Sequence, residues 1–124
     1  MPTPSPSSDP GSSGPKFRRA FFRVEYPFEM RPLLAWAGVF YQVLDVSERG
    51  IRLNVEGRPP FAAGSRIRAT VQFEDGVETI EGTLLRGNRR EAVFTLTEGV
   101  PLSRIRREER RVIRATRSGF PPGS

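Results

Sequence analysis

Three arginines near the start of the chain could bind a phosphate ester or a guanine base. Arg19 and Arg23 are four residues apart, and Arg18 directly precedes the first of them. A guanidinium group can hold phosphate oxygens, or the O6 and N7 atoms of guanine, through two parallel hydrogen bonds. The spacing therefore predicts an anion-binding arm before the first element of regular structure.

A second group of polar residues follows at Asp45, Ser47 and Gly50. The carboxylate of Asp45 can accept hydrogen bonds from the N1–H and amino groups of guanine. Ser47 can bond to the backbone of a turn or to a ligand, and we expect Gly50 to adopt a conformation that other residues avoid and to let the turn approach the ligand. The pattern predicts a tight turn between two strands that contributes to a binding site.

The chain contains no cysteine and no histidine. This composition excludes disulfides, thiolate chemistry, zinc sites built from Cys and His, and mechanisms that use a histidine acid or base. No pair of carboxylates or activated nucleophile is spaced for catalysis, and no group of Asp and Glu is spaced for a metal. We expect a protein that is not an enzyme and has no catalytic residue, metal site or cofactor.

Basic residues outnumber acidic residues by 20 to 14, which gives a formal net charge of +6. Lys16 is the single lysine, so the positive charge is almost entirely arginine, the side chain best suited to planar anions. A GC-rich coding sequence enriches arginine in the same way. The bias therefore supports an anionic partner only weakly.

Length and composition allow one domain with a core of about 100 residues. Residues 1–15 are rich in Pro, Ser and Gly and predict a disordered leader, and residues 118–124 predict a disordered tail. The domain then covers 16–117 and begins with the arginine arm, 16–23. No apolar run reaches the ~18 residues of a membrane span, and the leader lacks the apolar stretch of a signal peptide. We expect a cytoplasmic protein that does not insert into a membrane.

Residues 24–97 predict a small antiparallel β-barrel of six strands, so the fold class is mainly β. The strands are expected at 24–30, 39–45, 51–55, 66–73, 77–86 and 92–96, where apolar and polar residues alternate. Pro27 assigns the first strand to an edge of the sheet, and 33–38 is either a connector or a continuation of that strand. Short strands separated by frequent turns favour a barrel at this size.

Residues 101–117 change to helical spacing and predict a C-terminal α-helix. Pro101 suits the first turn, and Gly119 follows the end. The apolar positions are Leu102, Ile105, Val112 and Ile113. We expect this stripe to pack on the barrel while the many arginines of the helix face solvent; the alternative is that some of the arginines face the ligand or an acidic partner.

The order and spacing of these features resemble the PilZ domain family. That family has an RxxxR motif before its first strand and a DxSxxG motif between two later strands, and this chain carries both, at 19–23 and 45–50. The resemblance covers about residues 16–116 and includes the segment 61–67 at the entry to the next strand. Ala92 stands where the family often has glycine, outside the two motifs.

The resemblance implies a bacterial receptor for cyclic di-GMP. In such a receptor Arg19 and Arg23 would hold the phosphates and guanine, and Asp45, Ser47 and Gly50 would form the rest of the site. The ligand would neutralise the arm and order it over the barrel. An unidentified downstream protein would then recognise the changed surface.

The resemblance also assigns a role to Arg18. An arginine at this position is associated in the family with an intercalated pair of ligand molecules, so we expect two cyclic di-GMP molecules per chain.

A small β-barrel that binds RNA or single-stranded DNA is the alternative function. The net charge, the arginine-rich helix and the aromatic residues Phe40, Tyr41 and Phe73 as stacking platforms would favour it. However, aromatic residues at alternating strand positions more often belong to a core. A polymer binder also gains nothing particular from the turn that contains Asp45, so a nucleic-acid polymer is the less favoured partner.

Overall fold

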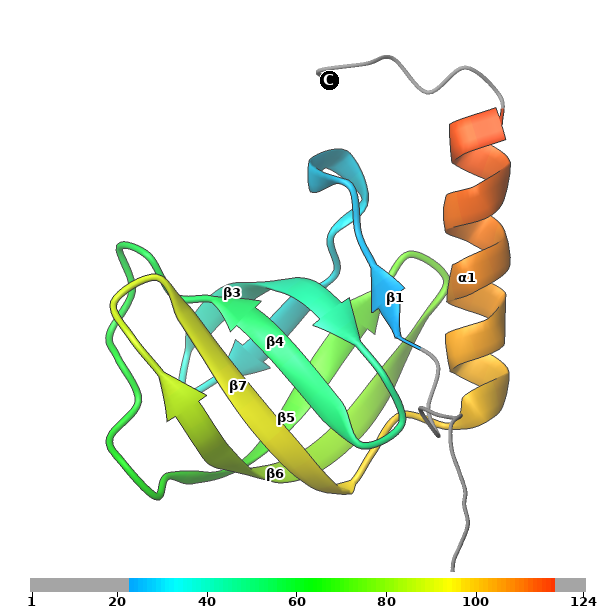
Figure 1. The fold of residues 1–124 in the computed structure, drawn as a ribbon. Helices are drawn as coiled ribbons and strands as arrows, with labels where there is room; N and C mark the ends of the chain where they lie inside the picture. Colours follow the sequence, from blue (N-terminus) through cyan, green and yellow to red (C-terminus); the bar gives the residue numbers. More distant parts are fainter. Residues whose placement is uncertain (1–22, 118–124) are drawn as a thin grey trace, which may run out of the picture.

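The computed structural model describes residues 23–117. Within this range a closed, six-stranded antiparallel β-barrel carries one α-helix at its C-terminal end (Figure 1). The predicted mainly β barrel with a terminal helix is therefore confirmed. The expected leader, most of the arginine arm and the expected tail lie outside the described residues.

The barrel runs in the order β3–β2–β5–β6–β7–β4 and closes where β3 pairs with β4. A short additional strand, β1, pairs with the end of β3 at Asp45 and Val46, beyond the residues of β3 that pair with β2. The strands are β1 Val24–Glu25, β2 Leu33–Trp36, β3 Val39–Val46, β4 Gly50–Asn54, β5 Arg66–Phe73, β6 Gly76–Gly87 and β7 Glu91–Glu98. All pairs are antiparallel.

The prediction of a first strand at 24–30 is correct only for its first two residues. Only Val24–Glu25 is a strand, and a 3₁₀-helix, η1, follows at Phe28–Met30. Pro27 has no N–H to continue the ladder with β3, and its φ of −59° places it at the start of η1. Proline thus ends the strand rather than merely placing it at an edge.

Residues 33–38, for which the sequence allowed a connector or a continuation of the first strand, contain a separate strand of the barrel, β2. β2 pairs with β3 on one side and with β5 on the other. A two-residue turn joins β2 to β3, and both of its residues, Ala37 and Gly38, have positive φ, 53° and 78°. Such turns suit hairpins, but alanine rarely adopts positive φ, so the sequence signal for this turn is weak.

The core fills the barrel with the inward-facing residues of its strands. It contains Leu34, Tyr41, Val43, Val46, Ile51, Leu53, Ile67, Ala69, Val71, Phe73, Ile80, Phe94 and Leu96, among others. Tyr41 and Phe73 are 1% and 6% exposed, whereas Phe40 is 48% exposed. Two of the three stacking platforms considered for a nucleic acid are therefore core residues.

Helix α1, Leu102–Arg117, lies beside β1 and the β5–β6 turn (Figure 1). Its predicted apolar stripe is only half correct. Ile105 is fully buried and Val112 packs against the core, but Leu102 and Ile113 are 36% and 43% exposed.

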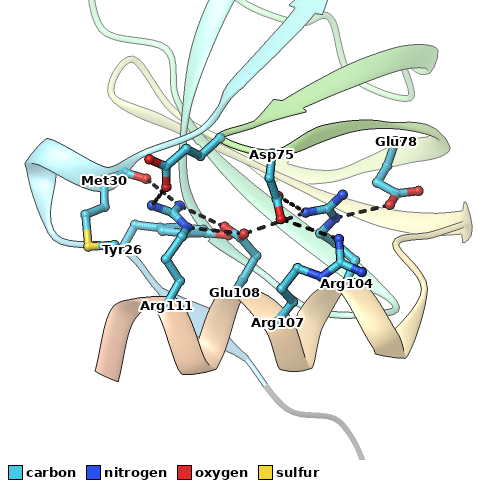
Figure 2. Close-up of polar contacts among 9 residues, drawn as sticks. Tyr26, Met30, Asp75, Glu78, Arg104, Arg107, Glu108 and Arg111 are labelled. Atoms are coloured by element: carbon cyan, nitrogen blue, oxygen red, sulfur yellow. Dashed lines mark hydrogen bonds and ion pairs between the residues drawn. The ribbon is translucent and has the colours of Figure 1, made fainter. Parts of the chain in front are cut away.

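The rest of the helix contact is polar, because Arg104, Glu108 and Arg111 share one face at helical spacing and meet the barrel (Figure 2). The expectation that the helix arginines face solvent is wrong for Arg104, which is 5% exposed.

Glu108 is the centre of this polar contact, and its side chain is fully buried. Tyr26 Oη donates a hydrogen bond to Glu108 Oε1 over 2.7 Å, and Arg111 Nη2 donates to the same oxygen over 2.9 Å (Figure 2). Burial, together with the hydrogen bond to Glu108, raises the pKa of Tyr26 well above its usual range. Arg111 also bonds Glu74 over 3.0 Å, so this contact ties the helix to the segment after β1 and to the β5–β6 turn.

Arg104 makes the second half of the contact one turn earlier in α1. It bonds Asp75 in the β5–β6 turn and Glu78 Oε2 over 3.2 Å (Figure 2). Its guanidinium also lies 4.9 Å from the ring centroid of Phe73. The hydrogen bond from Arg104 lowers the pKa of Asp75.

No helix in residues 23–117 is long and apolar enough to cross a membrane.

Candidate ligand-binding site

The β3–β4 turn carries the predicted acidic site residues. It is closed by a hydrogen bond from Ser47 N to Gly50 O, 2.9 Å long. A second bond, from Leu96 N to Arg49 O, also 2.9 Å, connects the turn to β7. The turn is thus held by β3, β4 and β7, and it lies at the end of the barrel nearest α1 (Figure 1).

Asp45 lies near the end of β3, 5% exposed, beside an irregularity in the β3–β4 pairing. Its Oδ2 accepts a hydrogen bond from Arg52 Nε over 2.7 Å, and Arg52 Nη1 bonds Glu91 Oε1 over 3.0 Å. Burial lowers the pKa of Arg52, but its bonds to Asp45 and Glu91 outweigh that effect and raise the pKa above its usual range. In this structure the carboxylate predicted to bind guanine is already paired.

Arg52 was not among the site residues predicted from the sequence. The signal that could have found it is hairpin register, because Asp45 and Arg52 are direct partners across the β3–β4 turn. Arg52 also lines a surface hollow of about 150 Å³ together with Arg86 and Glu91.

Ser47 is half-buried at the first position of the turn. Its hydroxyl lies 3.5 Å from Gly50 O, the outer limit for a hydrogen bond. The backbone of Ser47 holds the turn, and its side chain is only weakly engaged there.

Gly50 does not adopt the special backbone conformation expected of it. Among the described glycines, positive φ occurs at Gly38, Gly57 and Gly64, and not at Gly50. A Cβ at Gly50 would lie 3.6 Å from Phe94 O, an ordinary contact. The prediction that Gly50 is needed for its backbone conformation is therefore wrong. The other prediction, that Gly50 lets the ligand approach the turn, stays a prediction.

The glycine that the turn does require is Gly99, in the link between β7 and α1. A Cβ there would lie 1.8 Å from Glu48 O, in the middle of the turn. No L side chain fits at that distance, so the backbone of the turn rests directly on Gly99.

The last arginine of the arm is brought to the same place by β1. Val24 pairs with Val46 and Glu25 with Asp45, so one further antiparallel step places the backbone of Arg23 opposite Ser47. The side chain of Arg23 is exposed. The structure thus joins the end of one predicted motif to the other, while Arg18 and Arg19 lie outside the described residues.

A comparison with protein families identifies the arrangement. The PilZ domain family matches residues 17–116, which covers both motifs, the barrel and nearly all of α1. This chain belongs to the PilZ domain family. PilZ domains are receptors for cyclic di-GMP and are not a catalytic family. In the part of this PilZ domain that the structure describes, no group of three or more acidic residues could hold a metal ion.

A solved structure has a similar fold. The crystal structure of an uncharacterized Legionella protein superposes with a TM-score of 0.54 over 72% of this chain and 98% of that chain. The two sequences are 14% identical, so the likeness concerns the fold alone. A search of curated proteins finds no match to this PilZ domain.

Proposed function

We propose that this protein is a bacterial, cytoplasmic receptor for cyclic di-GMP that acts as a non-enzymatic adaptor. The observation that carries the proposal is the β1–β3 register within a PilZ domain, because it brings Arg23, the last residue of the arm, to the turn of Asp45 and Ser47. A phosphate-binding cation, Arg23, and a carboxylate acceptor, Asp45, then lie near each other at one end of the barrel.

Each group has a role that follows from its chemistry. Arg19 and Arg23 bind the phosphates and the O6 and N7 edge of guanine. Asp45 accepts from the guanine N1–H and amino groups, and Ser47 donates its hydroxyl, which the turn engages only weakly. Gly50 leaves room for the ligand to approach the backbone of the turn.

Arg18 extends the site to a second ligand molecule, so that two cyclic di-GMP molecules bind per chain as an intercalated pair. Their phosphates neutralise the arm and order it over the barrel. The ordered arm and the adjoining surface then bind a downstream protein. No covalent chemistry is required of any residue.

Calorimetric titration tests the receptor function. Cyclic di-GMP is titrated into the wild type and into Arg19→Ala/Arg23→Ala, with GTP and cyclic di-AMP as control ligands. Guanine-selective binding that saturates at two equivalents and is lost in the variant is expected. The matched control is Arg66→Ala/Arg68→Ala, which removes the same charge from exposed positions on β5 and should bind like the wild type.

Two results would contradict parts of this proposal. A wild type that does not bind cyclic di-GMP would contradict the receptor function. Saturation at one equivalent would contradict the role of Arg18 in binding a second ligand molecule. The ordering of the arm is tested separately by amide hydrogen exchange across residues 17–23. That exchange should slow at saturating ligand, and unchanged exchange would rule the switch out.

A further inference from the structure

Arg52 projects from the barrel beside the predicted site. Its neighbours on β4, Ile51 and Leu53, are buried in the core, so the alternation of the strand turns Arg52 outward. Its direct partner across the hairpin is Asp45. The two side chains therefore lie on the same outer face, next to the turn that carries Ser47.

The exposure of the pair decides which member a ligand meets first. The side chain of Asp45 is 8% exposed and that of Arg52 is 34% exposed. A guanidinium carries more N–H donors than the two contacts, to Asp45 and Glu91, use. A ligand that reaches Asp45 therefore also contacts the guanidinium group of Arg52 (its fork of N–H donors), which still has N–H donors available for hydrogen bonds.

Glu91 holds this fork in place. It bonds Arg52 Nη1 from β7 while Asp45 bonds Arg52 Nε from β3, so the guanidinium is fixed between carboxylates on both neighbouring strands. A planar cation fixed in this way can present its free N–H groups in one direction, at a smaller cost in side-chain entropy on binding.

The chemistry of the pair fits guanine and does not fit adenine. Guanine presents the O6 acceptor next to the N1–H and amino donors, so a carboxylate and an adjacent guanidinium satisfy both. Adenine carries an amino group where guanine carries O6. That amino group would face the N–H donors of Arg52 and leave them unpaired, which costs binding energy.

The geometry points to Arg52 as a specificity-determining residue of the ligand site: fixed by Asp45 and Glu91, it donates to guanine O6 while Asp45 accepts from the same base. This role rests on the proposed receptor function. It adds a third element of the fold, the outer face of β4, to the arm and the turn.

The test compares the affinities for cyclic di-GMP and cyclic di-AMP in the wild type, Arg52→Gln and Arg52→Lys. Loss of the fork should weaken cyclic di-GMP binding and reduce the guanine preference by roughly ten-fold or more, with little change for cyclic di-AMP. Arg52→Lys keeps the positive charge beside Asp45, so it guards against a folding defect in Arg52→Gln. Glu91→Gln leaves Arg52 bonded to Asp45 and should give a smaller change in the same direction.

Arg68→Gln is the matched control, because Arg68 also lies on a strand and pairs with a carboxylate, Glu81, of the neighbouring strand. It should leave both affinities unchanged. A wild type that binds cyclic di-GMP while the Arg52 variants keep its full guanine preference would overturn the role of Arg52 alone. A wild type that does not bind cyclic di-GMP would overturn the receptor function together with it.

Discussion

Glu108 shows how a charged residue can be accommodated in the contact between the helix and the barrel. It is fully buried, yet Tyr26 and Arg111 both donate to it. A buried carboxylate is tolerated only when its charge is compensated and its lone pairs are bonded. Removing one donor should therefore cost more than breaking an ordinary surface contact.

Tyr26→Phe removes the hydroxyl that donates to Glu108 and nothing else. We expect the free energy of unfolding at neutral pH to fall by about 2 kcal/mol, because hydrogen bonds to charged groups are the strong ones. Urea denaturation of both proteins measures this difference. A loss below the error of the measurement would mean that Arg111 alone satisfies Glu108.

The same variant gives a pH signature. The pKa of Tyr26 is raised in the folded protein, so its contribution is fully present below the pKa of the unfolded state, near 10, and is lost as the pH rises above that value. Wild-type stability should fall in this alkaline range, and Tyr26→Phe should lack that part of the fall. Thermal melts from pH 8 upward compare the two slopes.

Gly99 and Gly50 offer a matched pair of glycine substitutions at the binding turn. Gly99→Ala places a Cβ against Glu48 O and should cost about 3 kcal/mol of stability, because the backbone of the turn must shift. Gly50→Ala meets only ordinary contacts and should change stability by less than about 0.5 kcal/mol.

The two variants also separate structure from binding. If ligand approaches the turn at Gly50, Gly50→Ala should keep its melting temperature and lose affinity for cyclic di-GMP. Equal stability in both alanine variants would contradict the close approach of Glu48 to Gly99.

At the scale of elements, α1 is attached to the barrel by a mixed face. Ile105 supplies the deeply buried apolar contact, Val112 also packs against the core, and the ion pairs of Arg104, Glu108 and Arg111 supply the polar part of the contact. The acidic partners that the barrel supplies lie in the β5–β6 turn and on β6, so these ion pairs attach the helix at one corner of the barrel (Figure 2).

Two isoleucines of α1 test this account of the helix. Ile105→Ala removes a fully buried side chain and should cost about 3 kcal/mol. Ile113→Ala acts on a side chain that is 43% exposed and should cost less than about 1 kcal/mol. Circular dichroism during urea denaturation measures both, and similar losses would indicate that the whole predicted stripe packs on the barrel.

At the scale of the molecule, a ligand that binds only the folded state must stabilise all of it. At a free concentration ~100 times its dissociation constant, one bound cyclic di-GMP should add about 2.7 kcal/mol to the free energy of unfolding. Thermal melts should show this as a rise in melting temperature that Arg19→Ala/Arg23→Ala lacks, although that variant should melt normally without ligand. A rise of equal size in the variant would place the ligand elsewhere.

Much of the barrel could be predicted from the sequence. The segments 39–45, 51–55, 66–73, 77–86 and 92–96 all lie within observed strands, apart from Val55, which directly follows β4. Alternation is a local property, and these segments keep it because one of their faces is buried. β2 could not be recognised as a separate strand from the sequence, since the turn that follows it depends on an alanine at positive φ.

The sequence by itself determined the strand pattern, the terminal helix and the two motifs that indicate a PilZ domain, because these depend on neighbouring residues and short spacings. The tertiary structure alone decided which charged residues meet. Tyr26 and Glu108 are 82 positions apart. Glu91 bonds Arg52 from β7, and Gly99, directly after β7, lies against the backbone of Glu48. Such contacts arise from strand register and barrel closure, which bring distant segments together only when the whole chain has folded.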